Sequence, residues 1–148
     1  MAKKSSSVIE KHEALPSTHF EVLLAADITT ISPVVTWVMH LVSEMEYGAS
    51  KEFQIELALR EALANAVLHG CNADPSKRIE CSVTSDEDRG ILIVVRDPGK
   101  GFDATKVPSP TNEQNLFSEH GRGIFLINTL MDEVQYERNG AEIHMRKY

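Results

Sequence analysis

Apolar and polar positions along the chain follow patterns that predict a strand and then two helices in its first half. Residues 18–27, THFEVLLAAD, combine aliphatic and aromatic side chains in a pattern typical of a strand. Ser32 and Pro33 then resemble a helix N-cap followed by proline at the first helical position. The segment 33–46 places apolar residues three and four positions apart: Val34, Val38, Leu41, Val42 and Met45. This spacing predicts a helix with one buried face.

The second predicted helix spans residues 51–69, KEFQIELALREALANAVLH. Its Ala, Leu and Glu residues have high helix propensity. Gly70 follows at the position where a left-handed C-terminal cap would lie. Apolar residues surround most of the C-terminal half of this helix, so we expect it to be largely buried.

The second half of the chain predicts two hairpins. Residues 78–84 and 91–96 predict strands joined by an acidic turn, and the continuously apolar ILIVV indicates a central strand. Residues 132–138 and 141–147 predict a last hairpin that turns at Asn139 and Gly140. A helix is expected over 121–131, and the aperiodic segment 103–120 is typical of a functional loop.

This order of elements predicts an α+β fold, a two-layer α/β sandwich with helices on one face of a mixed, mainly antiparallel sheet. The 148 residues suit one domain, expected over 17–148 after a flexible tail over 1–16.

Cys71 and Cys81 form no CxxC pair, which favours reduced thiols. No apolar run approaches the roughly 18 residues that cross a bilayer, and no secretory signal is recognisable, so a cytoplasmic protein without membrane attachment is expected. The net charge of -7 disfavours nucleic acid as a partner.

Glu61, Asn65 and His69 lie four positions apart on the second helix. Their side chains therefore project from one helix face. Three polar residues alone are more typical of a solvated face. Because this helix is expected to be buried, however, an unsatisfied amide or carboxylate there would cost on the order of 1 to 3 kcal/mol. A bound ligand with a metal ion would supply the missing partners.

Two glycine-containing segments add candidate chemistry. Asp97 is the first residue of DPGKGFD, which directly follows the apolar strand. A carboxylate at the end of a strand can accept a hydrogen bond from an exocyclic amine, and the glycines let a flat ligand approach the backbone. Asp-Pro-Gly is also an ordinary turn sequence. Gly121 and Gly123 mark the entry to a helix, whose free N-terminal amides can bind phosphate. A flexible loop ending at a helix is an equally simple interpretation.

Together, the stretches EALANAVLHG, DPGKGFD and HGRGIFLINTLMDEV resemble the N, G1 and G2 boxes of the GHKL ATPase superfamily. Their spacing and amino-acid sequences are most similar to those of the anti-sigma-factor serine kinases, and the resemblance spans about residues 20–148. Three separated motifs in the right order make it specific. It implies a Bergerat-type ATP-binding fold with ATP and Mg²⁺ as cofactors.

The resemblance assigns a role to each matching residue. Asn65 matches the asparagine that coordinates magnesium, and Glu61 matches the carboxylate that accepts the proton of an attacking hydroxyl. Asp97 matches the aspartate that reads the adenine amino group. The remaining predicted cofactor-binding positions are His69, Gly99, Gly101, Phe102, Gly121, Arg122, Gly123 and Ile124. Residues 103–120 match the ATP lid, and Arg122 either touches a phosphate or faces solvent.

The same resemblance implies an ATP-dependent serine/threonine protein kinase that acts as an anti-sigma factor. Its substrate would be a STAS-like anti-anti-sigma regulator, its second partner a sigma factor, and its oligomeric state a homodimer. Two alternatives stay open: an ATP-binding module without catalysis, and the detached ATPase domain of a histidine kinase. Glu61 favours chemistry over passive binding, and the lack of a recognisable upstream phosphoacceptor helix disfavours the histidine kinase.

Overall fold

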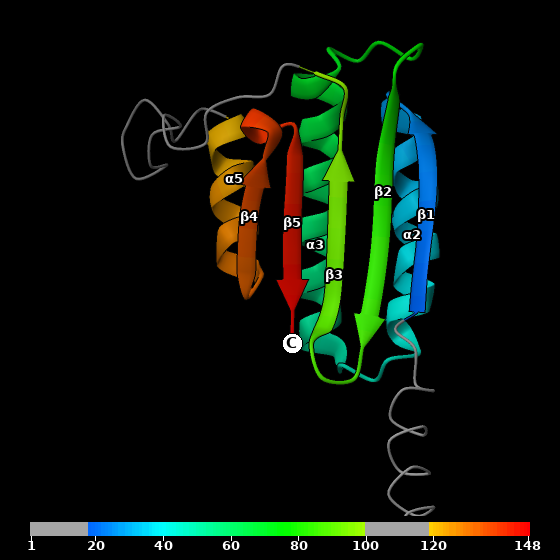
Figure 1. The fold of residues 1–148 in the computed structure, drawn as a ribbon, viewed down its shortest axis with the longest axis vertical. Helices are drawn as coiled ribbons and strands as arrows, with labels where there is room; N and C mark the ends of the chain where they lie inside the picture. The colour runs from blue at the N-terminus through cyan, green and yellow to red at the C-terminus, as the bar shows by residue number, and fades with distance from the viewer. Residues whose placement is uncertain (1–17, 100–118) are drawn as a thin grey trace, which may run out of the picture.

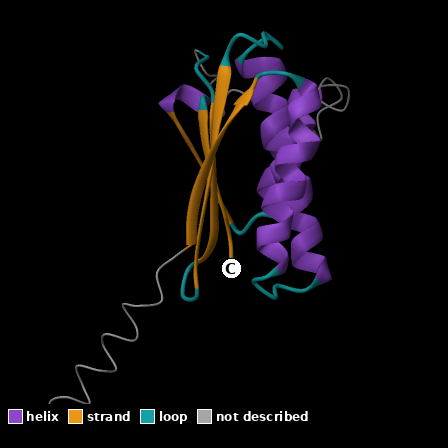
Figure 2. Cartoon of the chain, turned by 90° about the vertical axis from the view of Figure 1, so that its right-hand side faces the viewer, coloured by secondary structure: helices purple, strands orange, loops and turns teal. Residues whose placement is uncertain are grey.

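The computed structural model describes residues 18–99 and 119–148, with side chains from Gly121 onward in the second range. A five-stranded sheet forms one layer, and three helices cover one of its faces (Figures 1 and 2). The elements in chain order are β1 (Thr18–Ala25), α2 (Ile31–Ser43), α3 (Ala49–Asn65), β2 (Arg78–Asp86), β3 (Gly90–Arg96), α5 (Glu119–Leu130), β4 (Glu133–Glu137) and β5 (Glu142–Lys147). The predicted two-layer α+β sandwich is confirmed.

The strand order is β1-β2-β3-β5-β4, and β3 is central, as its apolar sequence predicts. All neighbouring pairs among the described strands are antiparallel, so no parallel pair of the expected mixed sheet occurs there. The connections explain this. β2–β3 and β4–β5 are consecutive in the chain, and the two helices between β1 and β2 return the chain so that β2 runs opposite to β1.

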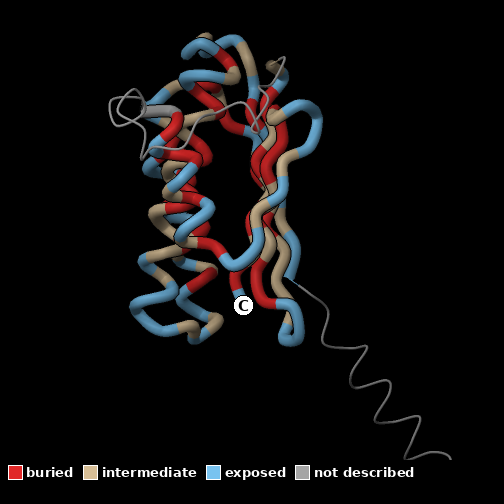
Figure 3. Tube along the Cα trace, turned by 90° about the vertical axis from the view of Figure 1, so that its left-hand side faces the viewer, coloured by how far each residue is buried: buried red, intermediate tan, exposed pale blue. Residues whose placement is uncertain are grey.

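The hydrophobic core fills the space between the sheet and the helices (Figure 3). Alternate residues of β3 point into it, and α2 contributes the face that its spacing predicts. Val34, Val38 and Val42 are buried, whereas Leu41 and Met45 are only partly buried. The helix begins at Ile31, so Ser32 lies inside it and the predicted Ser32 cap is wrong.

Gly70 is not a left-handed cap, and that prediction is wrong too. The α3 helix continues into a π-helical turn over Ala66–Gly70, in which the Cys71 N–H donates to the Ala66 carbonyl at 2.9 Å. Positive φ values occur two and three residues later, at Asn72 (52°) and Ala73 (54°). Turns of this kind are rare and often lie at functional sites.

The last part of the chain follows the predicted order. The turn between β4 and β5 lies at Arg138–Gly140, where Asn139 (58°) and Gly140 (88°) have positive φ values, as predicted for this pair. The α5 helix begins at Glu119, so it includes the last two positions of the segment expected to be a loop.

Cys71 and Cys81 are free and buried. Within the two described ranges, no helix has the length and apolar character needed to span a membrane.

Candidate functional site

A cavity lies between the C-terminal end of α3 and the strands β3, β4 and β5. Its apolar walls are Ala62, Ala66, Val95 and Ile143, and its polar lining includes Asn65, His69, Asp97 and Tyr136. Mainly apolar walls with a few convergent polar groups are characteristic of small-molecule sites. A flat, largely apolar ligand with one or two hydrogen-bonding edges fits this lining.

Asp97 provides the fixed acceptor at the edge of this cavity. Its backbone N–H donates to the Ala141 carbonyl at 2.9 Å, and its Oδ1 accepts from the Gly99 N–H at 2.8 Å. The residue is only 8% exposed. Burial raises the pKa of Asp97, while the hydrogen bond from Gly99 acts in the opposite direction. Asp97 thus presents a buried, oriented carboxyl group to whatever fills the cavity.

A second hollow, a groove between α3 and α5, lies beside the first. It is lined by Glu61, Ala64, Asn65, Leu68, His69, Arg122, Gly123 and Leu126. Asn65 and His69 line both hollows, so the cavity and the groove are neighbours at these two residues. Asp97 lines the first hollow and Glu61 the second, so the two carboxylates lie in neighbouring hollows along the C-terminal end of α3.

Glu61 and Asn65 converge on the backbone of α5 at Gly123. A Cβ atom at Gly123 would lie 2.8 Å from Glu61 Oε2 and 3.5 Å from both Oδ1 and Nδ2 of Asn65. A Cβ atom at this position would displace the Glu61 carboxylate, whereas its distance to Asn65 is an ordinary van der Waals contact. Amide and carboxylate oxygens are the donors that Mg²⁺ prefers, so this cluster suits a hard cation accompanying an anionic ligand.

The sequence matches the family described as Histidine kinase-like ATPase domain over residues 24–147. The chain belongs to this family. Serine-protein kinase RsbW of Bacillus velezensis is 30% identical over 137 residues, which cover 88% of this chain and 85% of that protein. Serine-protein kinase RsbW of Bacillus subtilis is 32% identical over 72% of this chain and 70% of its own length. Anti-sigma F factor of Priestia megaterium is 26% identical over 75% of this chain and 79% of that protein.

The residues predicted for this Histidine kinase-like ATPase domain differ in where the structure places them. Glu61, Asn65, His69, Asp97, Arg122 and Gly123 line one or both hollows. Gly99 lies in the turn that binds the Asp97 carboxylate, whereas the buried Gly121 and Ile124 line neither hollow. Gly101 and Phe102 lie outside the described residues, as does 103–118 of the predicted lid. Arg122 is exposed at the groove.

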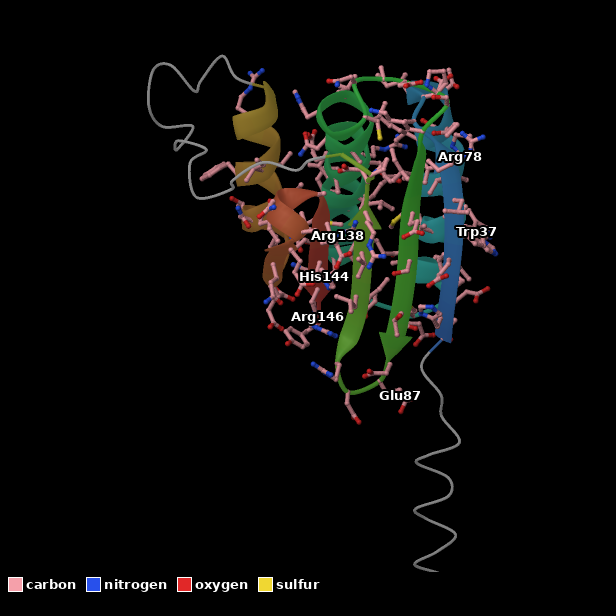
Figure 4. All side chains as sticks on the ribbon, turned by 45° about the horizontal axis from the view of Figure 1, so that its top comes forward. Trp37, Arg78, Glu87, Arg138, His144 and Arg146 are labelled. Atoms are coloured by element: carbon pink, nitrogen blue, oxygen red, sulfur yellow. The ribbon has the colours of Figure 1, made fainter. Side chains whose placement is uncertain are left out.

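The last hairpin contributes cavity residues that sequence reasoning missed. Tyr136 on β4, Gly140 in the turn, and Ala141 and Ile143 all line the cavity around Asp97. Burial raises the pKa of Tyr136 to about 12, so its phenol is neutral at physiological pH. Arg138, at the same turn (Figure 4), lowers the pKa of Asp97 by its positive charge, an effect smaller than that of burial. The only signal in the sequence was the alternation of Val134 and Tyr136 toward the core.

Proposed function

We propose that this chain is an ATP-dependent serine/threonine protein kinase that also acts as an anti-sigma factor. The convergence of Glu61 and Asn65 on Gly123, next to the cavity that holds Asp97, carries this proposal. The relatives support it, since two are named serine-protein kinase and a third is named anti-sigma F factor. The carboxylate of Glu61 at this groove favours chemistry over passive nucleotide binding.

The lining of the two hollows supports one placement of ATP and Mg²⁺. The adenine would fill the cavity, with Asp97 accepting a hydrogen bond from the exocyclic amino group, and the phosphates would extend into the groove past Asn65. The Asn65 side-chain oxygen would hold the metal ion in this arrangement. ATP supplies the phosphoryl group and Mg²⁺ neutralises its charge, so the protein contributes mainly alignment and electrostatics.

Glu61 would act as the general base. Its Oε2 lies where the α3 and α5 helices meet, at the open groove. There it would accept the proton that the hydroxyl of the substrate serine or threonine loses. A base acts in this way only within hydrogen-bond reach of the hydroxyl, so the substrate segment must enter the groove between the two helices.

The proposed partners follow from the same family relationship. The substrate would be an anti-anti-sigma regulator of the STAS-like class, and a sigma factor would be the second partner. We further propose that the chain works as a homodimer in the cytoplasm. The net charge of -7 gives no electrostatic support for a nucleic-acid partner.

Substitutions at Glu61 and Asn65 separate catalysis from binding. Glu61→Gln keeps the shape of the side chain but cannot accept a proton, so transfer should fall by ~10²- to 10⁴-fold while nucleotide affinity changes little. Asn65→Ala should weaken both magnesium-dependent affinity and transfer. The measurements are single-turnover phosphorylation of the cognate regulator with labelled ATP and calorimetric titration of each variant. Glu56→Gln, on the same helix but outside both hollows, is the matched control.

Two outcomes would contradict the proposal. Wild-type transfer by Glu61→Gln would show that Glu61 is not the base. A wild-type protein that binds ATP but never phosphorylates its cognate regulator would be an ATP-binding module instead.

A further inference from the structure

Gly70 and Asp97 are in close contact at the edge of the cavity. A Cβ atom at Gly70 would lie 2.4 Å from Asp97 Cγ, 2.4 Å from Oδ2 and 2.6 Å from Oδ1. These separations are far shorter than carbon–oxygen or carbon–carbon van der Waals contacts. A side chain at position 70 is therefore incompatible with the observed position of the Asp97 carboxylate.

The surroundings of Asp97 show which group would have to move. Its backbone is tied to β5 through the Ala141 carbonyl, and its Oδ1 is bound by the Gly99 N–H. A Cβ atom at Gly99 would lie 2.3 Å from the Gly70 carbonyl oxygen, so the two backbones also approach each other directly. The carboxylate is the only part of this contact that can rotate without shifting main chain.

The π-helical turn brings the Gly70 backbone to this position. The Cys71 N–H bonds to the Ala66 carbonyl and the Ala73 N–H bonds to the Val67 carbonyl, at 2.9 Å and 2.7 Å. Both bonds span more residues than the four of an α-helix, so the end of the helix is wider than an α-helical turn. The same turn begins directly after Asn65, which lines both hollows.

We propose that Gly70 is a positioning residue for base recognition. The space left by its missing side chain admits the direction of the Asp97 carboxylate that the Gly99 N–H holds, and with it the preference for a purine nucleotide that carries a 6-amino group. Gly70 itself needs no contact with the nucleotide for this role. The proposal rests on nucleotide binding at this site, as proposed above.

A thermal-denaturation cycle without nucleotide tests the contact itself. The four proteins are the wild type, Gly70→Ala, Asp97→Ala and the double variant. Gly70→Ala should lower the Tm when Asp97 is present and should have little effect, or raise the Tm, when the carboxylate has been removed. Equal shifts in both backgrounds would show that the two residues are not coupled and would overturn the proposal.

Calorimetric titration with ADP and with inosine diphosphate, each with Mg²⁺, tests the role in recognition. Inosine carries a 6-oxo group in place of the 6-amino group, so Asp97 cannot accept a hydrogen bond from the substituent at position 6 of the base. Gly70→Ala should reduce the wild-type preference for ADP by about tenfold or more, toward the ratio of Asp97→Ala. A purely structural defect would weaken both nucleotides equally and leave the ratio unchanged, which would overturn the proposal. Ala73→Ser, which also adds one heavy atom but at an exposed position, should retain the wild-type ratio.

The two experiments fail independently. If the wild type binds neither nucleotide, the proposed function is wrong, and the denaturation cycle still decides whether Gly70 sets the position of Asp97. If the cycle shows coupling but the ADP preference of Gly70→Ala equals that of the wild type, Gly70 has no part in base recognition.

Discussion

Lys147 donates a hydrogen bond from its Nζ to the carbonyl oxygen of Leu130, the last residue of α5, at 2.7 Å. Its side chain is almost fully buried, and Nζ also lies 3.5 Å from Asp132 Oδ1. The last carbonyls of a helix lack partners within the helix, and a cation at this end interacts favourably with the helix dipole. Lys147 therefore joins the end of the last strand to the end of the last helix.

Replacing Lys147 should destabilise the fold. Lys147→Met retains most of the buried apolar length but leaves the Leu130 carbonyl without this donor, so we expect a loss of about 1 to 3 kcal/mol in the free energy of unfolding. Urea denaturation measures it. Lys51 offers a matched comparison because its Nζ donates to the Tyr148 carbonyl in an exposed setting. Lys51→Met should change stability by less than about 0.5 kcal/mol, and equal effects of the two variants would contradict the role of burial.

Nucleotide affinity should depend on the ionisation of Asp97. Burial raises the pKa of Asp97, despite the opposing hydrogen bond from Gly99. Only the ionised carboxylate accepts hydrogen bonds with both oxygens, so ADP affinity should fall as the pH drops through this raised pKa. The decline should begin at a higher pH than for an ordinary aspartate, whose pKa is about 3.9. Calorimetric titrations over the acid range measure the decline, and Asp97→Asn should show no such inflection in its residual affinity.

Glu142 should make the fold sensitive to acid. Burial alone would raise its pKa, but hydrogen bonds from His144 and Arg96, together with their charges, lower the pKa of Glu142 below its usual value. His144 Nε2 lies 2.6 Å from Glu142 Oε2, and Arg96 bonds to the other carboxylate oxygen. A carboxyl whose pKa is lower in the folded state stabilises the fold above its unfolded pKa of about 4.3 and loses that contribution as the pH falls through the folded value.

The measurement is the Tm of the wild type and of Glu142→Gln as a function of pH. The variant should be less stable at neutral pH, and the difference should shrink below about pH 4.3 as the wild-type carboxyl becomes protonated. A difference that stays constant across this range would show that ionisation of Glu142 contributes nothing to stability.

Elements with a strong apolar period could be predicted from the sequence, and their exact ends could not. The spacing of Val34, Val38 and Val42 identified the buried face of α2, because packing against the sheet requires it. The π-helical turn at Ala66–Gly70 could not be predicted, since a helix-forming AVLH followed by glycine is equally typical of an ordinary α-helical end. The close approach of Gly70 to Asp97, which lies far away in the chain, is a tertiary contact that local sequence does not encode.

Some residues of the candidate site, likewise, could be predicted from the sequence and others could not. Glu61 and Asn65 could be found because the helical repeat places them on one face, and the structure brings both to Gly123. Tyr136 and Ala141 reach the cavity only because β5 pairs with β3 and β4 follows at the sheet edge. That order depends on pairing between distant segments, and neither residue belongs to a recognisable motif.

The connection through two helices gives the β1 edge of the sheet a different kinetic character from the two hairpins. The β2–β3 and β4–β5 pairs form between segments that are neighbours in the chain, whereas β1 pairs with β2 only across α2 and α3, and β3 pairs with β5 only across α5 and β4. Closing so long a loop is entropically slow, and a strand at the edge can detach without breaking either hairpin. The β1 strand is thus suited to join the sheet after the β2–β3 hairpin has formed and to exchange its amide protons before β3, which is paired on both sides.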